Sequence, residues 1–422
     1  MTDYLLGWLN KIQSLHSTNI DLSLERTIEV ARRLDVLHPT RPVVTVAGTN
    51  GKGSTVAGIE SIMLAAGFRV GAFTTPFLFV YNEQVRINGE SIDDDALCEA
   101  FKQVDAARGD ITLTPFEFGA LAAFVIFKQS HLDLWILEVG MGGRFDAVNA
   151  IDGDIAVVTS IAIDHAEWLG DTREKIAYEK AGIFRKNKPV IYGDLDPPQS
   201  LIDYAEKIQA PVFFQGKQFG WTKKKNSWDW HSEKNTLEHL STPPLFLQNM
   251  SAVLMAIELL QERLPVSRDA IDKGLKNIHL PGRIQYMLGG ITRIADVSHN
   301  PAAIAHLAEH LHQHPISGKT IAVFSMLSDK DIIGSIEAIK DEIEEWHVAP
   351  LDDARAACLE KLKNCFNRTG IKDVYFYDAL HGAEKEAIKR IKSQDRLVIF
   401  GSFKTVAVCG RSIEEVAGMG DR

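Results

Sequence analysis

The sequence predicts an α/β protein with two domains, each built on a mostly parallel sheet. The first observation is an apolar, largely β-branched run at residues 43–47, which leads into a glycine-rich loop and then a helical pattern. The second is a regular alternation of strand and helix patterns after residue 284. The third is Pro281-Gly282, which interrupts the chain between these regions. We therefore expect an N-terminal domain over residues 1–281 and a smaller C-terminal domain over residues 282–422.

The composition is that of a soluble globular protein. Of the 422 residues, 45% are hydrophobic and 24% are charged, which allows two or more domains with sizeable cores. The net charge of −10 disfavours a nucleic-acid-binding surface. Because the sequence has no N-terminal leader pattern and no uncharged span of 18 residues, we expect a cytoplasmic protein without a membrane partner. The four cysteines lack C-x-x-C spacing and predict neither a disulfide framework nor a zinc site.

The glycine-rich loop has the features of a phosphate-binding loop. Residues 48–54 read Gly-Thr-Asn-Gly-Lys-Gly-Ser, and glycines in such a loop let backbone N–H groups converge on an anion. Lys52 supplies a cation, and the Ser54 hydroxyl lies near a helix N-terminus, where it can reach Mg²⁺. The spacing departs from the standard G-x-x-x-x-G-K-[ST] pattern. A plain turn is the alternative, which the lysine and the following hydroxyl disfavour. The N-terminal domain is therefore predicted to be P-loop ATPase-like.

Three polar residues follow predicted parallel strands, at the edge where ligands bind in doubly wound sheets. Glu138 closes the apolar run 132–139, which is where a P-loop fold carries its metal-binding acid. Thr75 ends a strand at 68–73, although a simple turn there remains an alternative. His165 follows the strand 154–161, and a structural, hydrogen-bonded histidine remains equally open. For Lys180, in a predicted helix over 172–184, the pattern alone indicates a solvated helix face.

The rest of the N-terminal domain is predicted to be mostly helical. Residues 4–38 indicate two helices around residues 14–17, the second within an amphipathic segment at 21–37. Pro115 and Glu117 precede an apolar helix at 119–129 and suit its first turn. Further predicted elements are a strand at 189–193, short β-segments over 211–247 with a solvated lysine turn at 223–225, and helices at 249–263 and 266–277.

The C-terminal domain is predicted to be a Rossmann-like α/β domain. Asn300 suits an N-cap and Pro301 the first helical position, which leaves His299 without a structural explanation. The predicted strands cover residues 293–297, 319–326, 346–349, 374–377 and 396–400, and the predicted helices cover residues 301–314, 331–342, 354–366 and 381–392.

Six motifs together resemble the folylpolyglutamate synthase family of Mur-type amide ligases, and most closely its bacterial bifunctional dihydrofolate synthase/folylpolyglutamate synthase members. The motifs are G-T-N-G-K-G-S, L-E-V-G-M-G-G-R-F-D, D-H-x-x-x-L-G, E-K-A-G-I-F, L-P-G-R and H-N-P. The resemblance spans nearly the whole chain. It implies an ATP-dependent ligase that adds L-glutamate to 7,8-dihydropteroate and to folate mono- and polyglutamates through an acyl phosphate.

Two alternatives remain open at this point. One is a Mur-type ligase acting on a non-folate carboxylate such as a peptidoglycan precursor. Those ligases usually carry a separate domain before the P-loop, whereas 47 residues precede Gly48 here. The other is a non-enzymatic P-loop switch, which the second α/β domain disfavours.

The resemblance also implies the residues of the site. Lys52, Glu138, His165 and Lys180 would be catalytic, and Lys180 matches a lysine that is carbamylated in this family. Thr75 and Glu138 would hold one Mg²⁺ and His165 a second, and a monovalent cation is also implied. ATP would contact Thr49, Asn50, Gly51, Lys52, Gly53, Ser54, Asn249, Arg283, Asp296 and His299. The pteroate or folate would contact Ser14, Leu15, His16, Ser17, Thr114, Pro115, Phe116, Glu117, Phe145, Asp146 and Ala147.

One motif departs from the family pattern, and two further expectations concern the whole molecule. The family commonly has S-P-H where this chain has Thr75-Pro76-Phe77. Threonine keeps the metal-binding oxygen, whereas phenylalanine has no ligand atom. We expect a monomer. Its two domains are expected to close on ATP, because Arg283 and Asp296 lie beyond the domain boundary and the P-loop lies before it.

Overall fold

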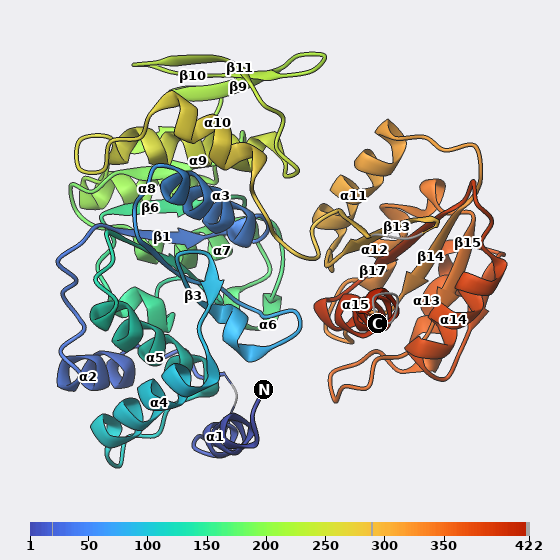
Figure 1. Cartoon of the computed structure of the whole chain (residues 1–422), viewed down its shortest axis with the longest axis horizontal. Helices are drawn as coiled ribbons and strands as arrows, with labels where there is room; N and C mark the ends of the chain where they lie inside the picture. Colours follow the sequence, from blue (N-terminus) through green and yellow to red (C-terminus); the bar gives the residue numbers. More distant parts are fainter. Residues whose placement is uncertain (19, 288–289, 419–422) are drawn as a thin grey trace. The chain divides into compact units, whose positions relative to one another are not determined.

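The structure is a computed structural model that describes residues 1–18, 20–287 and 290–418. The chain divides into two compact units, Met1–His279 and Leu280–Arg422 (Figure 1). Both units have α/β architecture, which confirms the predicted fold class. None of the described helices is long and apolar enough to cross a membrane.

Unit 1 is built on an eight-stranded sheet in its described residues, with the order β4-β3-β2-β5-β1-β6-β7-β8. In the run β2-β5-β1-β6-β7-β8 every neighbouring pair of strands is parallel. At the other edge, β3 pairs antiparallel with both β2 and β4. The strands are β1 (Val43–Ala47), β2 (Val70–Phe73), β3 (Val85–Ile87), β4 (Glu90–Ser91), β5 (Leu134–Glu138), β6 (Ile155–Val158), β7 (Val190–Tyr192) and β8 (Val212–Phe214). A separate antiparallel sheet contains β9 (Phe219–Lys223), β10 (Trp228–Ser232) and β11 (Thr236–Leu240).

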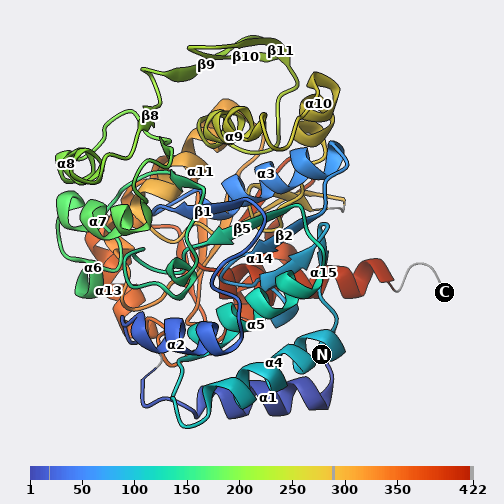
Figure 2. The ribbon, with the colours of Figure 1, turned by 90° about the vertical axis from the view of Figure 1, so that its left-hand side faces the viewer.

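Helices cover both faces of the large sheet, which explains why β1 and β5 are buried at every position. On one face α3 packs against α9 and α10, and on the other α5 packs against α4 (Figures 1 and 2). The helices of unit 1 are α1 (Asp3–Gln13), α2 (Glu25–Arg33), α3 (Lys52–Ala65), α4 (Asp94–Arg108), α5 (Pro115–Gln129), α6 (Ala166–Leu169), α7 (Arg173–Lys180), α8 (Gln199–Ile208), α9 (Leu247–Leu260) and α10 (Arg268–Lys276). Short 3₁₀ turns lie at Tyr81–Gln84, Ala147–Ala150 and Ala181–Ile183.

The strand order places the chain reversal of the sheet beside β1. From β1 the chain runs through α3 to β2 on one side, whereas from β6 it runs through α7 to β7 on the other. Ligands of doubly wound sheets bind outside the carboxyl ends of the strands at such a reversal. The register aligns these ends, because Val46 pairs with Glu138 and Ala47 with Val158. The carboxyl end of β1 is therefore the place to look for a site in unit 1.

Unit 2 is built on a six-stranded sheet in its described residues, with the order β12-β13-β17-β14-β15-β16. Only β12 pairs antiparallel. A core of apolar side chains from α11, α12 and α13 lies against the sheet. The strands are β12 (Gln285–Met287), β13 (Thr292–Asp296), β14 (Thr320–Phe324), β15 (Glu345–Val348), β16 (Val374–Phe376) and β17 (Arg396–Phe400). The helices are α11 (Pro301–Gln313), α12 (Ile332–Glu337), α13 (Leu359–Thr369), α14 (Leu380–Arg390) and α15 (Phe403–Gly418), with a 3₁₀ turn at Lys340–Glu342.

Several predicted elements have different bounds in the structure. The segment predicted at 21–37 is helical only over Glu25–Arg33, and the helix predicted at 119–129 begins at Pro115. The helix predicted to begin at residue 354 begins at Leu359. The predicted capping of α11 by Asn300 and Pro301 is confirmed. The sequence patterns did not indicate α4, α8 or α15.

Candidate active site

The predicted phosphate-binding loop lies between β1 and α3 and is held by the end of β6. Gly51 has φ +87°, a conformation that favours glycine, and a Cβ there would lie 2.5 Å from Asn249 Oδ1 of α9. The Thr49 N–H donates to Ser160 O at 2.8 Å, and the Thr159 hydroxyl donates to Asn50 O at 2.6 Å. The structure thus brings Asn249 against the loop, and the adjacent strand fixes the loop backbone.

Two lysine side chains donate to the same carbonyl oxygen of this loop. Lys52 Nζ lies 3.2 Å from Gly48 O, and Lys180 Nζ lies 2.9 Å from it. The pattern-based prediction that Lys180 lies on a solvated helix face is wrong, because α7 directs its side chain to the loop and leaves the residue 4% exposed. Burial and the neighbouring charge of Lys52 lower the pKa of Lys180 to about 7. The neutral form of the Lys180 amine is therefore well populated at neutral pH.

Two of the predicted metal-binding residues, Thr75 and Glu138, contact each other at this edge. Glu138 ends β5 and is 3% exposed, and its Oε2 accepts the Thr75 N–H at 3.3 Å. A Cβ on Gly53 would lie 3.8 Å from the same Oε2, so the first turn of α3 approaches the carboxylate. Carboxylate and hydroxyl oxygens are hard donors that suit Mg²⁺. The side chains of Ser54, Thr75 and Glu138 therefore have the donor chemistry for one ion.

His165 has a different setting from Glu138. It has φ +52° and caps α6, and its Nε2 lies 3.9 Å from Asp164 Oδ2. The neighbouring Asp164 carboxylate acts electrostatically on Lys180, where its negative charge opposes the lowering of the lysine pKa. An imidazole nitrogen suits transition metals better than Mg²⁺. Among the side chains that the structure describes, in residues 1–18, 20–287 and 290–410, no three or more of His, Cys, Asp or Glu gather as a metal site. A bound ion would keep waters or phosphate oxygens as its other ligands.

Two of the predicted pteroate-binding segments come together at Gly140, which follows β5. A Cβ on Gly140 would lie 2.6 Å from Phe116 Cε2 and 3.3 Å from Asp146 Oδ2. The Asp146 carboxylate is buried and accepts the N–H groups of Met141 and Val148, at 2.9 and 3.1 Å. Burial raises the pKa of Asp146 to about 7. Beside Asp146, Phe145 is exposed and Ala147 is buried.

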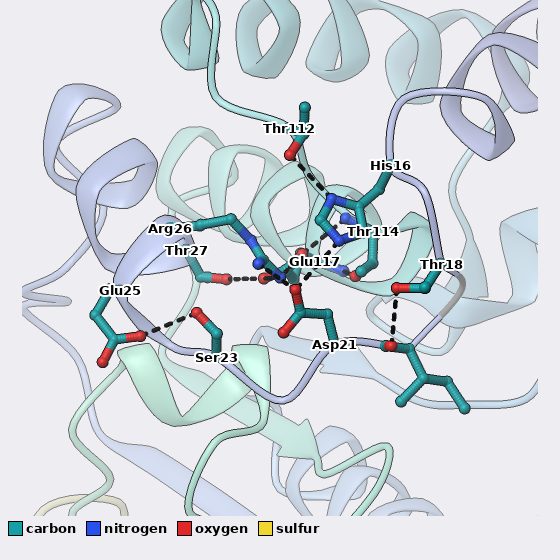
Figure 3. A network of polar contacts seen from close by, with 11 residues as sticks. His16, Thr18, Asp21, Ser23, Glu25, Arg26, Thr27, Thr112, Thr114 and Glu117 are labelled. Carbon is teal, nitrogen blue, oxygen red and sulfur yellow. Dashed lines mark hydrogen bonds and ion pairs between the residues drawn. The ribbon is translucent and has the colours of Figure 1, made fainter.

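Glu117 is saturated by contacts within the protein. Its Oε1 accepts Arg26 Nη2 at 3.0 Å and the Thr27 hydroxyl at 3.2 Å. Its Oε2 accepts the Thr114 N–H at 2.7 Å and Arg26 Nη2 at 3.2 Å. Arg26 Nη1 in turn donates to Asp21 Oδ2 at 2.6 Å (Figure 3). Charge-assisted bonds of this kind are among the stronger contacts in proteins, so Arg26 fastens the segment before α2 to the start of α5.

Of the predicted N-terminal residues, only His16 belongs to this arrangement. His16 Nε2 lies 3.2 Å from Asp21 Oδ2, and His16 Nδ1 lies 2.9 Å from Thr112 Oγ1 (Figure 3). Ser14 instead donates its hydroxyl to Lys11 O. Leu15 packs on the core of unit 1, and Ser17 is exposed. We call the connected side chains the Glu117 network; its members are His16, Asp21, Arg26, Thr27, Thr112, Thr114 and Glu117.

Three predicted nucleotide ligands come together within unit 2. The buried carboxylate of Asp296, at the end of β13, accepts the N–H groups of Ile284 and Ser298, each at 2.8 Å. The guanidinium carbon of Arg283 lies 5.2 Å from the centre of the Phe403 ring. The His299 ring lies 6.1 Å from the same ring, and its Nδ1 is hydrogen-bonded with Val297 O. Phe403, which the sequence patterns did not single out, is thus common to Arg283 and His299.

Both units match protein families that share one class of chemistry. Residues 46–255 match the Mur ligase middle domain, and residues 282–403 match the Mur ligase, glutamate ligase domain. The fold and the loop at β1 therefore define a Mur-type ligase. The chain belongs to the dihydrofolate synthase/folylpolyglutamate synthase family, and it is an ATP-dependent ligase.

Relatives and solved structures support this assignment over nearly the whole chain. The dihydrofolate synthase/folylpolyglutamate synthase of Escherichia coli K12 is 41% identical over 403 residues, which cover 96% of this chain and 94% of that protein. A solved structure of E. coli FolC in complex with DHPP and ADP has a TM-score of 0.94 at 41% identity, with 98% of both chains covered. The Yersinia pestis enzyme, described as bifunctional, has a TM-score of 0.91 at 41% identity, with 97% of this chain and 98% of that chain covered.

Proposed function

We propose that this chain uses ATP to join L-glutamate to 7,8-dihydropteroate and to folate mono- and polyglutamates. ATP-dependent glutamate ligation in folate metabolism is the function of its family. The observation that carries the assignment to this chain is the gathering of Lys52, Lys180 and Glu138 around the loop at Gly48, within a chain related to these ligases over 96% of its length. Similar structures contain DHPP with ADP in one case, and Mn, AMPPNP and L-glutamate in another.

The chemical obstacle is the meeting of two anions. The acceptor carboxylate must attack the γ-phosphorus of ATP so that ADP leaves and an acyl phosphate forms. The glutamate amine then attacks the acyl carbon, and inorganic phosphate leaves. The loop N–H groups and Lys52 offset the negative charge on the phosphates. Ser54, Thr75 and Glu138 would hold one divalent ion and His165 a second, and such ions would supply positive charge that offsets the negative charge of the phosphates.

Lys180 is proposed to carry a carbamate. Carbamylation needs a neutral amine, because the nitrogen lone pair attacks CO₂ and a proton leaves. The pKa of about 7 makes that neutral form common at neutral pH, and burial shields the product from water. The product would be a carbamate, whose negative charge lies on the two oxygens of the group bonded to Nζ. This group would lie beside Gly48 and close to Asp164. Such a group is suited to orient a metal ion or to accept a proton.

The acceptor would lie between Phe116 and Asp146. Phe116 offers an aromatic face to a flat ring, and Asp146 can donate or accept a proton in a hydrogen bond because its pKa lies near 7. Thr114 and Pro115 begin α5 beside Phe116. Arg283, Asp296 and His299 of unit 2 are further proposed contacts of ATP.

The chain would act in the cell as a cytoplasmic monomer that binds a monovalent cation and has no nucleic acid or membrane partner. The negative charge of −10 is consistent with this. Light scattering of the purified chain during gel filtration, with and without ATP, tests the monomer directly.

ADP release tests the proposed function. The purified chain is supplied with ATP, Mg²⁺, L-glutamate and either 7,8-dihydropteroate or a reduced folate monoglutamate. We expect ADP release that depends on glutamate with both acceptors. Release with dihydropteroate alone would limit the activity to dihydrofolate synthesis. No glutamate-dependent release with either acceptor would overturn the proposal, and release in a parallel assay with a UDP-sugar acid would instead identify a peptidoglycan ligase.

A further inference from the structure

The turn at the start of unit 2 contains a residue in an unfavourable backbone conformation. Ile284 has φ +44°, which lies in the left-handed region that β-branched side chains rarely adopt. Gly282 is also left-handed, with φ +72°, but glycine tolerates this conformation. Such a conformation at isoleucine persists only where the surrounding structure holds it. The contacts of this turn should therefore show what holds Ile284.

The buried carboxylate of Asp296 holds Ile284 in this conformation. Its Oδ2 accepts the Ile284 N–H at 2.8 Å, while its Oδ1 accepts the Ser298 N–H at 2.8 Å. Gly282, two residues before Ile284, is fixed as well, since its N–H donates to Gln285 Oε1 at 2.8 Å and its carbonyl oxygen accepts the Val297 N–H at 2.9 Å. Hydrogen bonds to an ionised carboxylate are about twice as strong as neutral ones. The carboxylate thus joins the turn to the end of β13.

Arg283 lies between these two fixed residues. Its guanidinium carbon lies 5.2 Å from the centre of the Phe403 ring, within the range of a cation–π contact. If Ile284 relaxed to a negative φ, the backbone on either side of that residue would change direction. The side chain of Arg283 would then leave its present place on Phe403. The conformation of Ile284 and the placement of Arg283 are therefore coupled through the backbone.

We propose that Asp296 is a positioning residue, which holds Ile284 in the left-handed conformation and thereby directs Arg283 toward the phosphates of the nucleotide. This inference rests on the proposed role of Arg283 in the nucleotide site. It assigns Asp296 an action through the backbone of its own unit and requires no direct contact between Asp296 and ATP. Because the β-branched side chain of Ile284 disfavours the left-handed conformation, the turn depends on the hydrogen bond to Asp296.

Nucleotide binding in three backgrounds tests this inference. The dissociation constant of AMPPNP is measured by calorimetry on the full chain, with and without Asp296→Ala, in wild type, Ile284→Gly and Ile284→Val. In wild type we expect Asp296→Ala to weaken binding by roughly tenfold or more. In the Ile284→Gly background, Asp296→Ala should weaken binding by only about twofold, because glycine adopts the left-handed conformation without the hydrogen bond to Asp296. Valine, which is also β-branched, should show the full loss.

The outcomes separate a positioning role from direct contact. Equal losses in all three backgrounds would overturn the inference, because a direct contact with ATP does not depend on the residue at position 284. Unchanged binding in Arg283→Ala would also overturn it. If Asp296→Ala does not fold, Asp296→Asn repeats the comparison, since it keeps one acceptor oxygen. The ligase activity is judged separately by glutamate-dependent ADP release from wild type, so failure there with the coupling intact counts against the proposed function alone.

Discussion

Two regions of unit 1 show two ways of building a site. The phosphate-binding loop is formed by consecutive residues, and its geometry comes from backbone groups such as the Thr49 N–H donating to Ser160 O. The Glu117 network instead joins side chains far apart in sequence, since Arg26 and Glu117 are 91 residues apart (Figure 3). The first region should serve the chemistry and the second should serve the fold. Substitutions in the two regions should therefore affect different measurements.

The largest expected effect is on turnover, from Lys52→Ala. Removing one preorganised charge that faces the phosphates typically lowers turnover by ~10²–10³. The free energy of unfolding should stay near that of wild type, because Lys52 is only partly buried and bonds to loop carbonyls. Steady-state ADP release and urea unfolding measure the two quantities. Near-normal glutamate ligation in this variant would remove the loop from the mechanism.

Arg26→Ala should instead lower the free energy of unfolding more than it lowers turnover. Removing the guanidinium leaves the buried Glu117 carboxylate without its charged partner, which should lower the free energy of unfolding by about 2–3 kcal/mol. Arg32→Ala, on the same helix, is the matched control, since Arg32 is exposed and pairs with exposed Glu29. Urea unfolding should find the control unchanged. Equal stability of the two variants would show that the Glu117 network does not hold the fold.

His165→Ala should act on the metal rather than on the fold. Because we propose His165 as the ligand of a second ion, the Mg²⁺ concentration for half-maximal activity should rise about tenfold or more, with slower turnover. Replacing Mg²⁺ by Mn²⁺ should magnify the difference from wild type, since an imidazole nitrogen suits transition metals. Metal titrations of ADP release give both results. Unchanged titration curves would leave His165 as a structural residue.

The smallest expected effect is the pH dependence that Lys180 gives to stability. Its folded-state pKa of about 7 lies below the ordinary value of 10.5, so the unfolded chain binds more protons between these values. The burial penalty is fully present below pH 7 and is lost as pH rises toward 10.5. In CO₂-free buffer, wild type should gain about 1 kcal/mol relative to Lys180→Met between pH 7.5 and 8.5. A constant difference would show that Lys180 is not a neutralised buried amine.

The sequence predicted what depends on neighbouring residues. The loop at Gly48 and the position of Glu138 follow from a strand pattern and the residues directly after it, and the structure confirms those local elements. Lys180 was placed on the wrong face because its helix is polar, and only the packing of α7 shows that the side chain points to the loop. Arg26 has no local signal at all, since its partner Glu117 belongs to another helix.

The strained backbone at Ile284 could not be predicted from the sequence either. Nothing in the order Gly282, Arg283, Ile284 predicts that the isoleucine rather than only the glycine is left-handed. That conformation depends on Asp296, which reaches the turn from the end of β13. The family resemblance located Arg283 and Asp296 as a pair of interest, but the contact that joins them runs through Ile284. Long-range contacts of this kind become visible only in three dimensions.

We expect the residues at the loop edge to activate the acceptor as an acyl phosphate before glutamate attacks. Labelling both carboxylate oxygens of the acceptor with ¹⁸O tests this directly. With glutamate present, we expect one labelled oxygen in each inorganic phosphate released, and we expect Lys52→Ala to lower labelled phosphate and ADP together. Unlabelled phosphate, or label recovered in AMP, would contradict it.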